Sequence, residues 1–70
     1  MGFLYVAYPG SRDVYIDGSQ VGTTNTPIEV ADGHHQIALA QGVACSPPTQ
    51  NIEVDGEPET APKSISFSPL

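Results

Sequence analysis

The sequence has little cysteine and little positive charge. Its 70 residues include one cysteine, no tryptophan and two basic side chains against eight acidic ones, for a formal net charge of −6 at pH 7. The lone Cys45 excludes an intramolecular disulfide and a metal site built from several cysteines. Because Arg12 and Lys63 are its sole cations, the chain has no electrostatic basis for binding a phosphate backbone or an anionic membrane surface. We therefore expect no nucleic-acid partner and no metal or other cofactor.

Long hydrophobic runs are also missing. No segment approaches the ~20 apolar residues of a membrane-spanning helix. The apolar start, residues 1–8, is too short for a secretory signal and has no basic residue before it. We therefore expect no direct membrane insertion. The location stays open between the cell envelope or surface, if the chain is a fragment, and the cytoplasm or a larger assembly otherwise.

Glycine and proline are plentiful and argue against helix. Seven of each recur along the whole chain and leave no uninterrupted helical pattern of about ten residues. Short runs of β-branched and aromatic residues lie between them, which is typical of an all-β domain. We predict one domain over residues 1–70, a small antiparallel β-sandwich of six or seven short strands. The predicted strands cover residues 3–8, 13–16, 19–22, 28–30, 34–40, 49–54 and 63–68.

The alternation of apolar and polar residues within these runs predicts which side chains face the core. A core of this size only roughly offsets the ordering entropy of so short a chain, so a partner could supply further stability. The predicted core consists of Leu4, Val6, Val14, Ile16, Val21, Ile28, Val30, Ile37, Leu39, Ile52, Val54, Ile65 and Phe67.

The pair Asp17-Gly18 is the strongest turn signal. Between two short strands it predicts a two-residue hairpin turn, because both central residues of such a turn need positive φ. After the hairpin, Thr23 and Thr24 can hydrogen-bond backbone groups where the chain leaves the strand, and Pro27 fixes φ there. The presence of each of these residues is therefore explained by the needs of folding alone, without a binding or catalytic role.

The run SRDVYIDGSQVGTT over Ser11–Thr24 is preceded by Pro9-Gly10 and followed by Thr26-Pro27-Ile28 and Ala31-Asp32-Gly33-His34-His35. With these neighbours it resembles the PEGA domain family, over about residues 3–40. The chain departs from the family pattern at Asn25-Thr26, which lengthens the link to Pro27, and at residues 41–45, which replace a Gly-Tyr pair. The resemblance implies a small, non-catalytic β-sandwich, often carried on bacterial and archaeal cell-envelope proteins, with a binding or spacing role.

Two groups of residues have the side-chain types of a metal site. His34 and His35 are adjacent, so on a strand they point to opposite faces and cannot chelate one ion together without a bulge. We expect His34 in solvent and His35 at the rim of the core. The carboxylates of residues 55–59 alternate as in a calcium loop, but a bidentate Glu at the expected distance is missing. We expect an ordinary solvated loop, with weak calcium binding as the alternative.

No arrangement of residues indicates catalysis. The serines fall in turns or on outward strand positions, with no histidine and acid at a suggestive spacing. Cys45 has no cationic neighbour or helix N-terminus near it in the sequence to activate its thiol. We expect no enzyme activity, and we expect Cys45 to be buried or idle, or to form an intermolecular disulfide.

Tyr5, Tyr8 and Tyr15 are the candidate partner-binding residues. If Phe3, Tyr5 and Tyr15 share a face, they form a small exposed aromatic patch of the kind that anchors protein interfaces and stacks on sugars. Packing between neighbouring strands is the alternative interpretation of these rings.

Together these observations favour a non-enzymatic protein-binding or scaffolding module, an accessory or structural part of a larger assembly or of the cell envelope. Two alternatives stay open: a carbohydrate-binding module on a cell-surface protein, and a decoration subunit of a shell or filament.

Overall fold

Strands account for the regular structure that the computed structural model describes, over residues 1–40, 42–46 and 48–69. They are β1 (Gly2–Ala7), β2 (Asp13–Ile16), β3 (Ser19–Thr23), β4 (Pro27–Val30), β5 (Gly33–Leu39), β6 (Cys45–Ser46), β7 (Thr49–Val54), β8 (Lys63–Ser66) and β9 (Ser68–Pro69). Within these ranges no helix is long and apolar enough to cross a bilayer. The all-β prediction is confirmed. The predicted loop over 41–48 contains the short β6, while its Gln41 and Pro47 lie outside the described residues.

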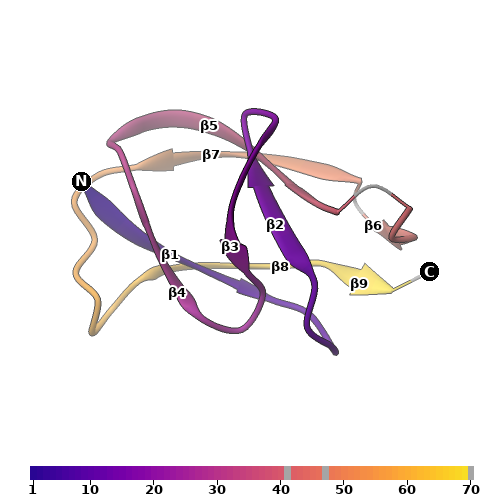
Figure 1. Cartoon of the computed structure of the whole chain (residues 1–70). Coiled ribbons are helices and arrows are strands. Elements are labelled where there is room, and N and C mark those ends of the chain that lie inside the picture. Colours follow the sequence, from indigo (N-terminus) through magenta and orange to yellow (C-terminus); the bar gives the residue numbers. More distant parts are fainter. Residues whose placement is uncertain (41, 47, 70) are drawn as a thin grey trace.

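Two sheets form the layers of the sandwich (Figure 1). One has three strands in the order β4-β1-β8, and the other has four in the order β3-β2-β5-β7. The short strands β6 and β9 pair separately. The chain passes from the four-stranded sheet to the three-stranded one after β3, and it returns between β4 and β5. Each sheet buries its inner face against the other, as the alternating hydropathy of the strands requires.

One pairing differs from the antiparallel prediction, because β1 and β8 run parallel, with Val6 opposite Ile65. The loop after β7 explains the difference. β7 ends at the same end of the sandwich where β1 begins, and the Phe3 amide donates to the Glu57 carbonyl at 2.9 Å. The chain therefore enters β8 from the end at which β1 starts, and the two strands point the same way.

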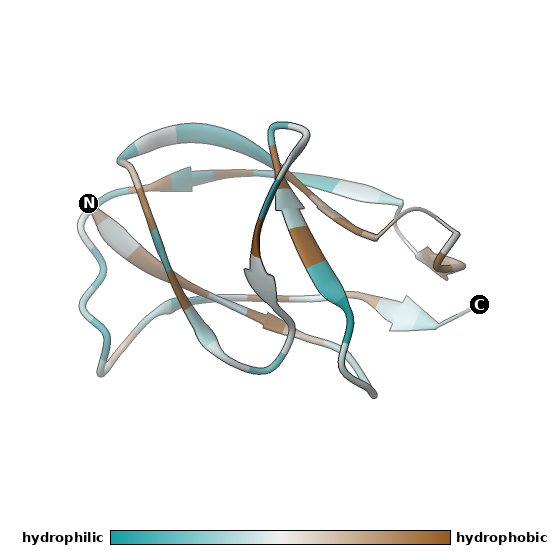
Figure 2. Ribbon diagram, viewed as in Figure 1, coloured by the Kyte–Doolittle hydropathy of each residue, from teal (hydrophilic) through white to brown (hydrophobic). Residues whose placement is uncertain are grey.

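The core lies between the two sheets and follows the predicted alternation. Figure 2 shows hydrophobic and hydrophilic residues interspersed along the strands. The buried apolar side chains include every predicted core residue except Val21 and Ile65. Cys45 is buried with them, as one of the expectations for its side chain had it, although it was not in the predicted core set. Ile65 is half-buried and still packs against this cluster.

The prediction that Val21 is buried is wrong, because its side chain is 44% exposed. A β-bulge is the cause. Val14 pairs with Gly22 while Tyr15 pairs with Gln20, so Val21 is an extra residue that reverses the alternation. Gly22 takes the inward position instead, where an added Cβ would lie 3.0 Å from the Ile28 side chain.

The Asp17-Gly18 hairpin is confirmed. φ is +52° at Asp17 and +87° at Gly18, the left-handed values that a tight turn between β2 and β3 requires. This turn closes one end of the four-stranded sheet, and the Asp17 amide donates to the Gln36 carbonyl of β5 at 2.9 Å.

Candidate functional site

The three candidate tyrosines lie in three different environments. Tyr5 is on β1 between the buried Leu4 and Val6, so it faces outward from the three-stranded sheet. Tyr15 is on β2 between two buried residues and faces outward from the four-stranded sheet. Because the two outward faces lie on opposite sides of a sandwich, Tyr15 does not share a face with Phe3 and Tyr5, and the condition for a joint patch of the three rings is not met.

Tyr8 follows the end of β1 and belongs to neither face. Its half-buried ring packs against the core cluster. The Arg12 guanidinium lies over the same ring, 5.9 Å from its centre, which is within cation–π distance. The Tyr8 ring is therefore in contact with the core and with Arg12 of the same chain.

We call the outward side of the three-stranded sheet the aromatic face. Phe3, Tyr5 and Ala7 project from its central strand β1. The cross-strand neighbours of Tyr5 are Pro27 on β4 and Ser64 on β8, and Ala7 lies opposite Ser66. The aromatic face consists of Phe3, Tyr5, Ala7, Pro27, Glu29, Ser64 and Ser66. The two rings thus lie in a row flanked mainly by short, uncharged side chains.

We call the outward side of the four-stranded sheet the amide face. Across the strands, Tyr15 lies opposite Gln20 on β3 and Ala38 on β5, and Ala38 lies opposite Thr49 on β7. In the next row Gln36 lies opposite Asn51. The amide face consists of Tyr15, Gln20, Gln36, Ala38, Thr49 and Asn51. These six residues are uncharged and include one aromatic ring, and the charged or titratable residues Asp13, His34 and Glu53 lie beside them on the same side of the sheet.

A shallow pocket opens at one side of the amide face. Its volume is about 380 Å³, and it is lined by Asp17, His34, His35, Gln36 and Asn51. The Asp17-Gly18 turn, β5 and β7 supply these residues. Sequence reasoning did not single out Gln36 or Asn51. Their outward positions on adjacent strands were visible in the alternation, but the pairing of β5 with β7 was not.

His35 joins three segments at this end of the sandwich. Its Nδ1 lies 2.7 Å from Oδ2 of Asp17, and its Nε2 lies 2.7 Å from the carbonyl oxygen of Ala31. Both partners are acceptors, so both contacts are hydrogen bonds at the same time only when both ring nitrogens carry a proton, that is, in the imidazolium form. The second Asp17 oxygen accepts from the Gln36 amide at 2.9 Å. We call Asp17, His35 and the Ala31 carbonyl the imidazolium clasp.

The electrostatics of the clasp agree with its geometry. The hydrogen bond to Asp17, followed by the one to the Ala31 carbonyl, raises the pKa of His35 above its ordinary value of 6.5. The Gln36 amide, and after it the hydrogen bond to His35, lower the pKa of Asp17 below its ordinary 3.8. Protonated His35 and ionised Asp17 are therefore favoured together.

The two histidines point apart, as predicted. The His34 side chain is 84% exposed, and its Nε2 lies 3.7 Å from a Glu53 oxygen on β7. The His35 side chain is 16% exposed and lies at the rim of the core. Sequence reasoning placed both rings but missed the Asp17 partner. No local signal could have found it, because Asp17 meets His35 only through the pairing of β2 with β5.

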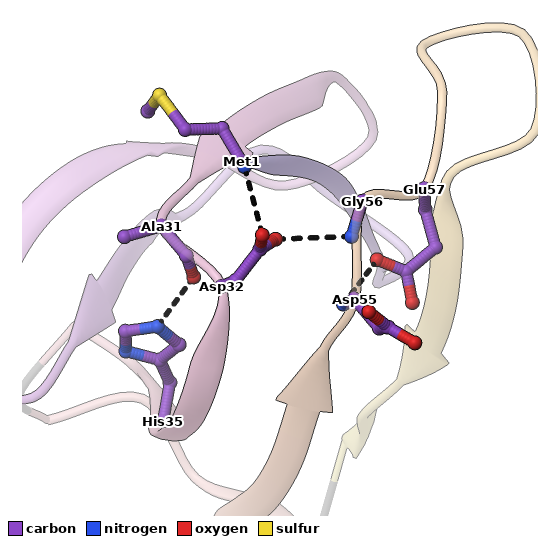
Figure 3. A network of polar contacts seen from close by, with 7 residues as sticks. All are labelled: Met1, Ala31, Asp32, His35, Asp55, Gly56 and Glu57. Atoms are coloured by element: carbon purple, nitrogen blue, oxygen red, sulfur yellow. Dashed lines mark hydrogen bonds and ion pairs between the residues drawn. The ribbon is translucent and has the colours of Figure 1, made fainter.

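Glu57 in the acidic loop after β7 and Asp32 just before β5 accept hydrogen bonds from within the chain (Figure 3). Asp32 bridges the Met1 amine at 3.1 Å and the Gly56 amide at 3.0 Å, and Glu57 accepts from the Asp55 amide at 2.9 Å. The Asp55 amide, followed by the amide of Glu57 itself, lowers the pKa of Glu57, and the Met1 amine, followed by the Gly56 amide, lowers the pKa of Asp32. Over the described residues, no three histidine, cysteine or acidic side chains are grouped as metal ligands.

A second polar network holds the opposite end of the sandwich. Thr24 is 2% exposed, and its hydroxyl donates to the Gly10 carbonyl at 2.7 Å and accepts from the Arg12 amide at 3.0 Å. Asn25, at φ +64°, donates through its side chain to the Tyr8 and Gly10 carbonyls and accepts from the Tyr8 amide. The predicted hydrogen bonding to backbone groups is confirmed for Thr24, whereas the Thr23 hydroxyl lies 3.3 Å from the Thr26 hydroxyl. We call Thr24, Asn25 and their partners the threonine network.

These features can be set beside known proteins. No curated protein and no solved structure matches the chain. The family model described as PEGA domain matches residues 6–43, which is more than half of the 70-residue chain. The matched segment runs from β1 through β5 and contains the hairpin, Thr24, Asn25 and the clasp. The chain therefore belongs to the PEGA domain family.

Proposed function

We propose that this domain is a non-enzymatic protein-binding module that joins a larger assembly through its aromatic face. The observation that carries the proposal is the row formed by Phe3 and Tyr5 on the central strand β1. Aromatic side chains are enriched in the buried centres of protein interfaces, where charged residues are depleted. The short side chains of Ala7, Ser64 and Ser66 leave the row accessible to a flat partner surface.

The composition supports the same proposal. The chain carries a net charge of −6, yet Glu29 is the one charged residue on the aromatic face. A small domain also gains little stability from its own core, so burial of further apolar surface against a partner would stabilise it. A partner with an apolar, uncharged surface fits these properties, within an envelope, shell or filament. Binding through such a face should depend weakly on salt concentration.

The test compares matched variants on the two faces. Wild type, Tyr5→Ser and Tyr15→Ser are used to capture partners from the native source, and complexes are sized by gel filtration with light scattering. We expect one protein to co-purify with wild type and Tyr15→Ser, and its affinity for Tyr5→Ser to fall by about tenfold or more. Circular dichroism of each variant checks that the fold is intact.

Two outcomes would contradict the proposal. One is a wild-type domain that stays monomeric and captures nothing. The other is a partner that Tyr5→Ser and Tyr15→Ser bind equally well, since binding would then not use the aromatic face.

A further inference from the structure

The amide face and its pocket lie on the side of the sandwich that the proposed protein contact does not use. Tyr15 and Gln36 sit on adjacent strands two residues apart in register, a diagonal separation of roughly 7–8 Å. Asn51 lies directly opposite Gln36. One ring and two amides are therefore within reach of a single small ligand.

The amides are available for hydrogen bonding. Over the described residues, the side chains of Gln20, Gln36 and Asn51 make no hydrogen bond to the rest of the chain, and all three residues are exposed. Each side-chain amide can donate hydrogen bonds through its NH₂ group and accept them through its carbonyl oxygen. Such a set matches a ligand whose groups both donate and accept, as hydroxyl groups do.

The charges on this surface further restrict the class of ligand that it can bind. Asp17 lines the pocket, but its carboxylate faces the His35 imidazolium and the Gln36 amide. Glu53 faces His34 across the strands. On this surface Asp17 and Glu53 each face a histidine, Asp13 next to Tyr15 on β2 is a further carboxylate, and no unpaired cation among the described residues is present to attract an anion. A neutral ligand is the one that meets no electrostatic penalty here.

We propose that the amide face is a binding site for a neutral oligosaccharide. The C–H face of a hexose ring packs on the Tyr15 ring, and its hydroxyl groups exchange hydrogen bonds with Gln36 and Asn51. An aromatic ring provides the apolar surface and the amides fix the orientation, a combination that suits small polar ligands. The pocket of about 380 Å³ bounded by His34 and the Asp17 turn receives the next sugar unit.

The test is an NMR titration of the ¹⁵N-labelled domain with neutral tetrasaccharides of glucose, mannose, galactose and N-acetylglucosamine. We expect at least one to bind, with amide shifts concentrated at Tyr15, Gln36, Ala38 and Asn51. Tyr15→Ala should weaken binding by about tenfold, and Asn51→Ala by about threefold. Tyr15→Phe should stay within about twofold of wild type, because the ring and not its hydroxyl makes the contact. Tyr5→Ala is the matched control on the aromatic face and should bind the sugar unchanged.

Each of the following results would overturn the proposal. None of the four sugars shifts any amide up to its solubility limit, or the shifts map to β1 and β8 instead. An acidic oligosaccharide or a peptide binds the amide face more tightly than any neutral sugar. Thermal unfolding of each variant shows whether a loss of binding is a loss of fold, and Tyr15→Phe keeps the test valid if Tyr15→Ala unfolds. Failure here leaves the protein-binding proposal intact, since that one depends on Tyr5.

Discussion

The two ends of the sandwich are tied by side chains of different chemistry. At one end the threonine network joins the segment after β1 to the segment after β3 through the hydroxyl of Thr24 and the amide of Asn25. At the other end the imidazolium clasp joins the β2–β3 turn to the chain between β4 and β5. Both replace missing strand pairing with hydrogen bonds to loop backbone. The first uses neutral groups alone, and the second uses a cation and an anion.

This difference assigns separate roles to the two ends. A neutral network keeps its hydrogen bonds at any pH where the backbone folds, while the clasp holds both acceptors only as long as His35 is protonated. The Thr24 hydroxyl is also buried, whereas the Asp17 side chain is 54% exposed. Hydrogen bonds to buried groups cost most when broken, and exposed charge pairs contribute little. The threonine network should therefore carry more of the stability, and the clasp should carry the pH response.

The largest effect is expected from Thr24→Val, which keeps the shape of the side chain and removes the hydroxyl. The Gly10 carbonyl and the Arg12 amide lose their partner in a buried site, so the free energy of unfolding should fall by about 2 kcal/mol. Urea unfolding measures the loss, which should be equal on both sides of pH 6.5. The exposed Thr60→Val is the control and should change stability by less than about 0.5 kcal/mol. A pH-dependent loss would refute the separation of the two ends.

A smaller effect is expected from Asn25→Ala. Alanine loses the side-chain hydrogen bonds and is strained at φ +64°, so we expect a loss of about 1.5 kcal/mol, again independent of pH. Asn25→Gly removes the same hydrogen bonds without the strain and should recover about 1 kcal/mol of that loss. Thermal unfolding of the three proteins measures both steps. Equal stability of the Ala and Gly variants would show that φ at this residue has no energetic weight.

The smallest effect belongs to the clasp and is a pH dependence. The pKa of His35 is raised in the folded chain, so its contribution is complete below the ordinary value of 6.5 and is lost as pH rises through the folded pKa. The pKa of Asp17 is lowered, so its contribution is present above 3.8 and is lost as pH falls through the folded value. The contribution of this pair to the free energy of unfolding should therefore be greatest between pH 3.8 and 6.5.

His35→Gln provides the comparison, since glutamine can donate to one acceptor but carries no charge. The unfolding free energy of wild type should decrease as pH rises above 6.5. This decrease should be absent in His35→Gln and should keep its shape in Thr24→Val. Denaturant unfolding across the pH range measures both. If His35→Gln retained the wild-type decline, another group would be responsible for it, and the role given to the clasp would be wrong.

Local rules predicted the parts of the fold that depend on neighbours in the chain. Asp17-Gly18 predicts its turn because two successive residues must adopt a left-handed backbone there, and Asp-Gly is one of the few residue pairs that favour this conformation. Alternation predicted the burial of Leu4, Val6 and Ile37, and it placed His35 inward and His34 outward. It failed at Val21, because a bulge is a property of the pairing between β2 and β3 and not of β3 alone.

The candidate sites were less predictable than the fold. Alternation correctly predicted that Tyr5 and Tyr15 point outward. It could not predict that the two rings lie on opposite sides of the sandwich, because that depends on which sheet each strand joins. The pairing of Asp17 with His35 and of Gln36 with Asn51 likewise joins residues that the sequence keeps 15 or more positions apart. No local pattern carries that information.

The sequence by itself determined that this chain has an all-β fold, few cations, a tight Asp-Gly hairpin and a PEGA domain match. These follow from composition, from alternation and from the φ values that a turn demands. The tertiary structure alone decided the parallel pairing of β1 with β8, the separation of the aromatic face from the amide face, and the clasp on His35. The physical reason is that strand order is set by how two sheets bury one core, and residues distant in the chain meet only once that order exists.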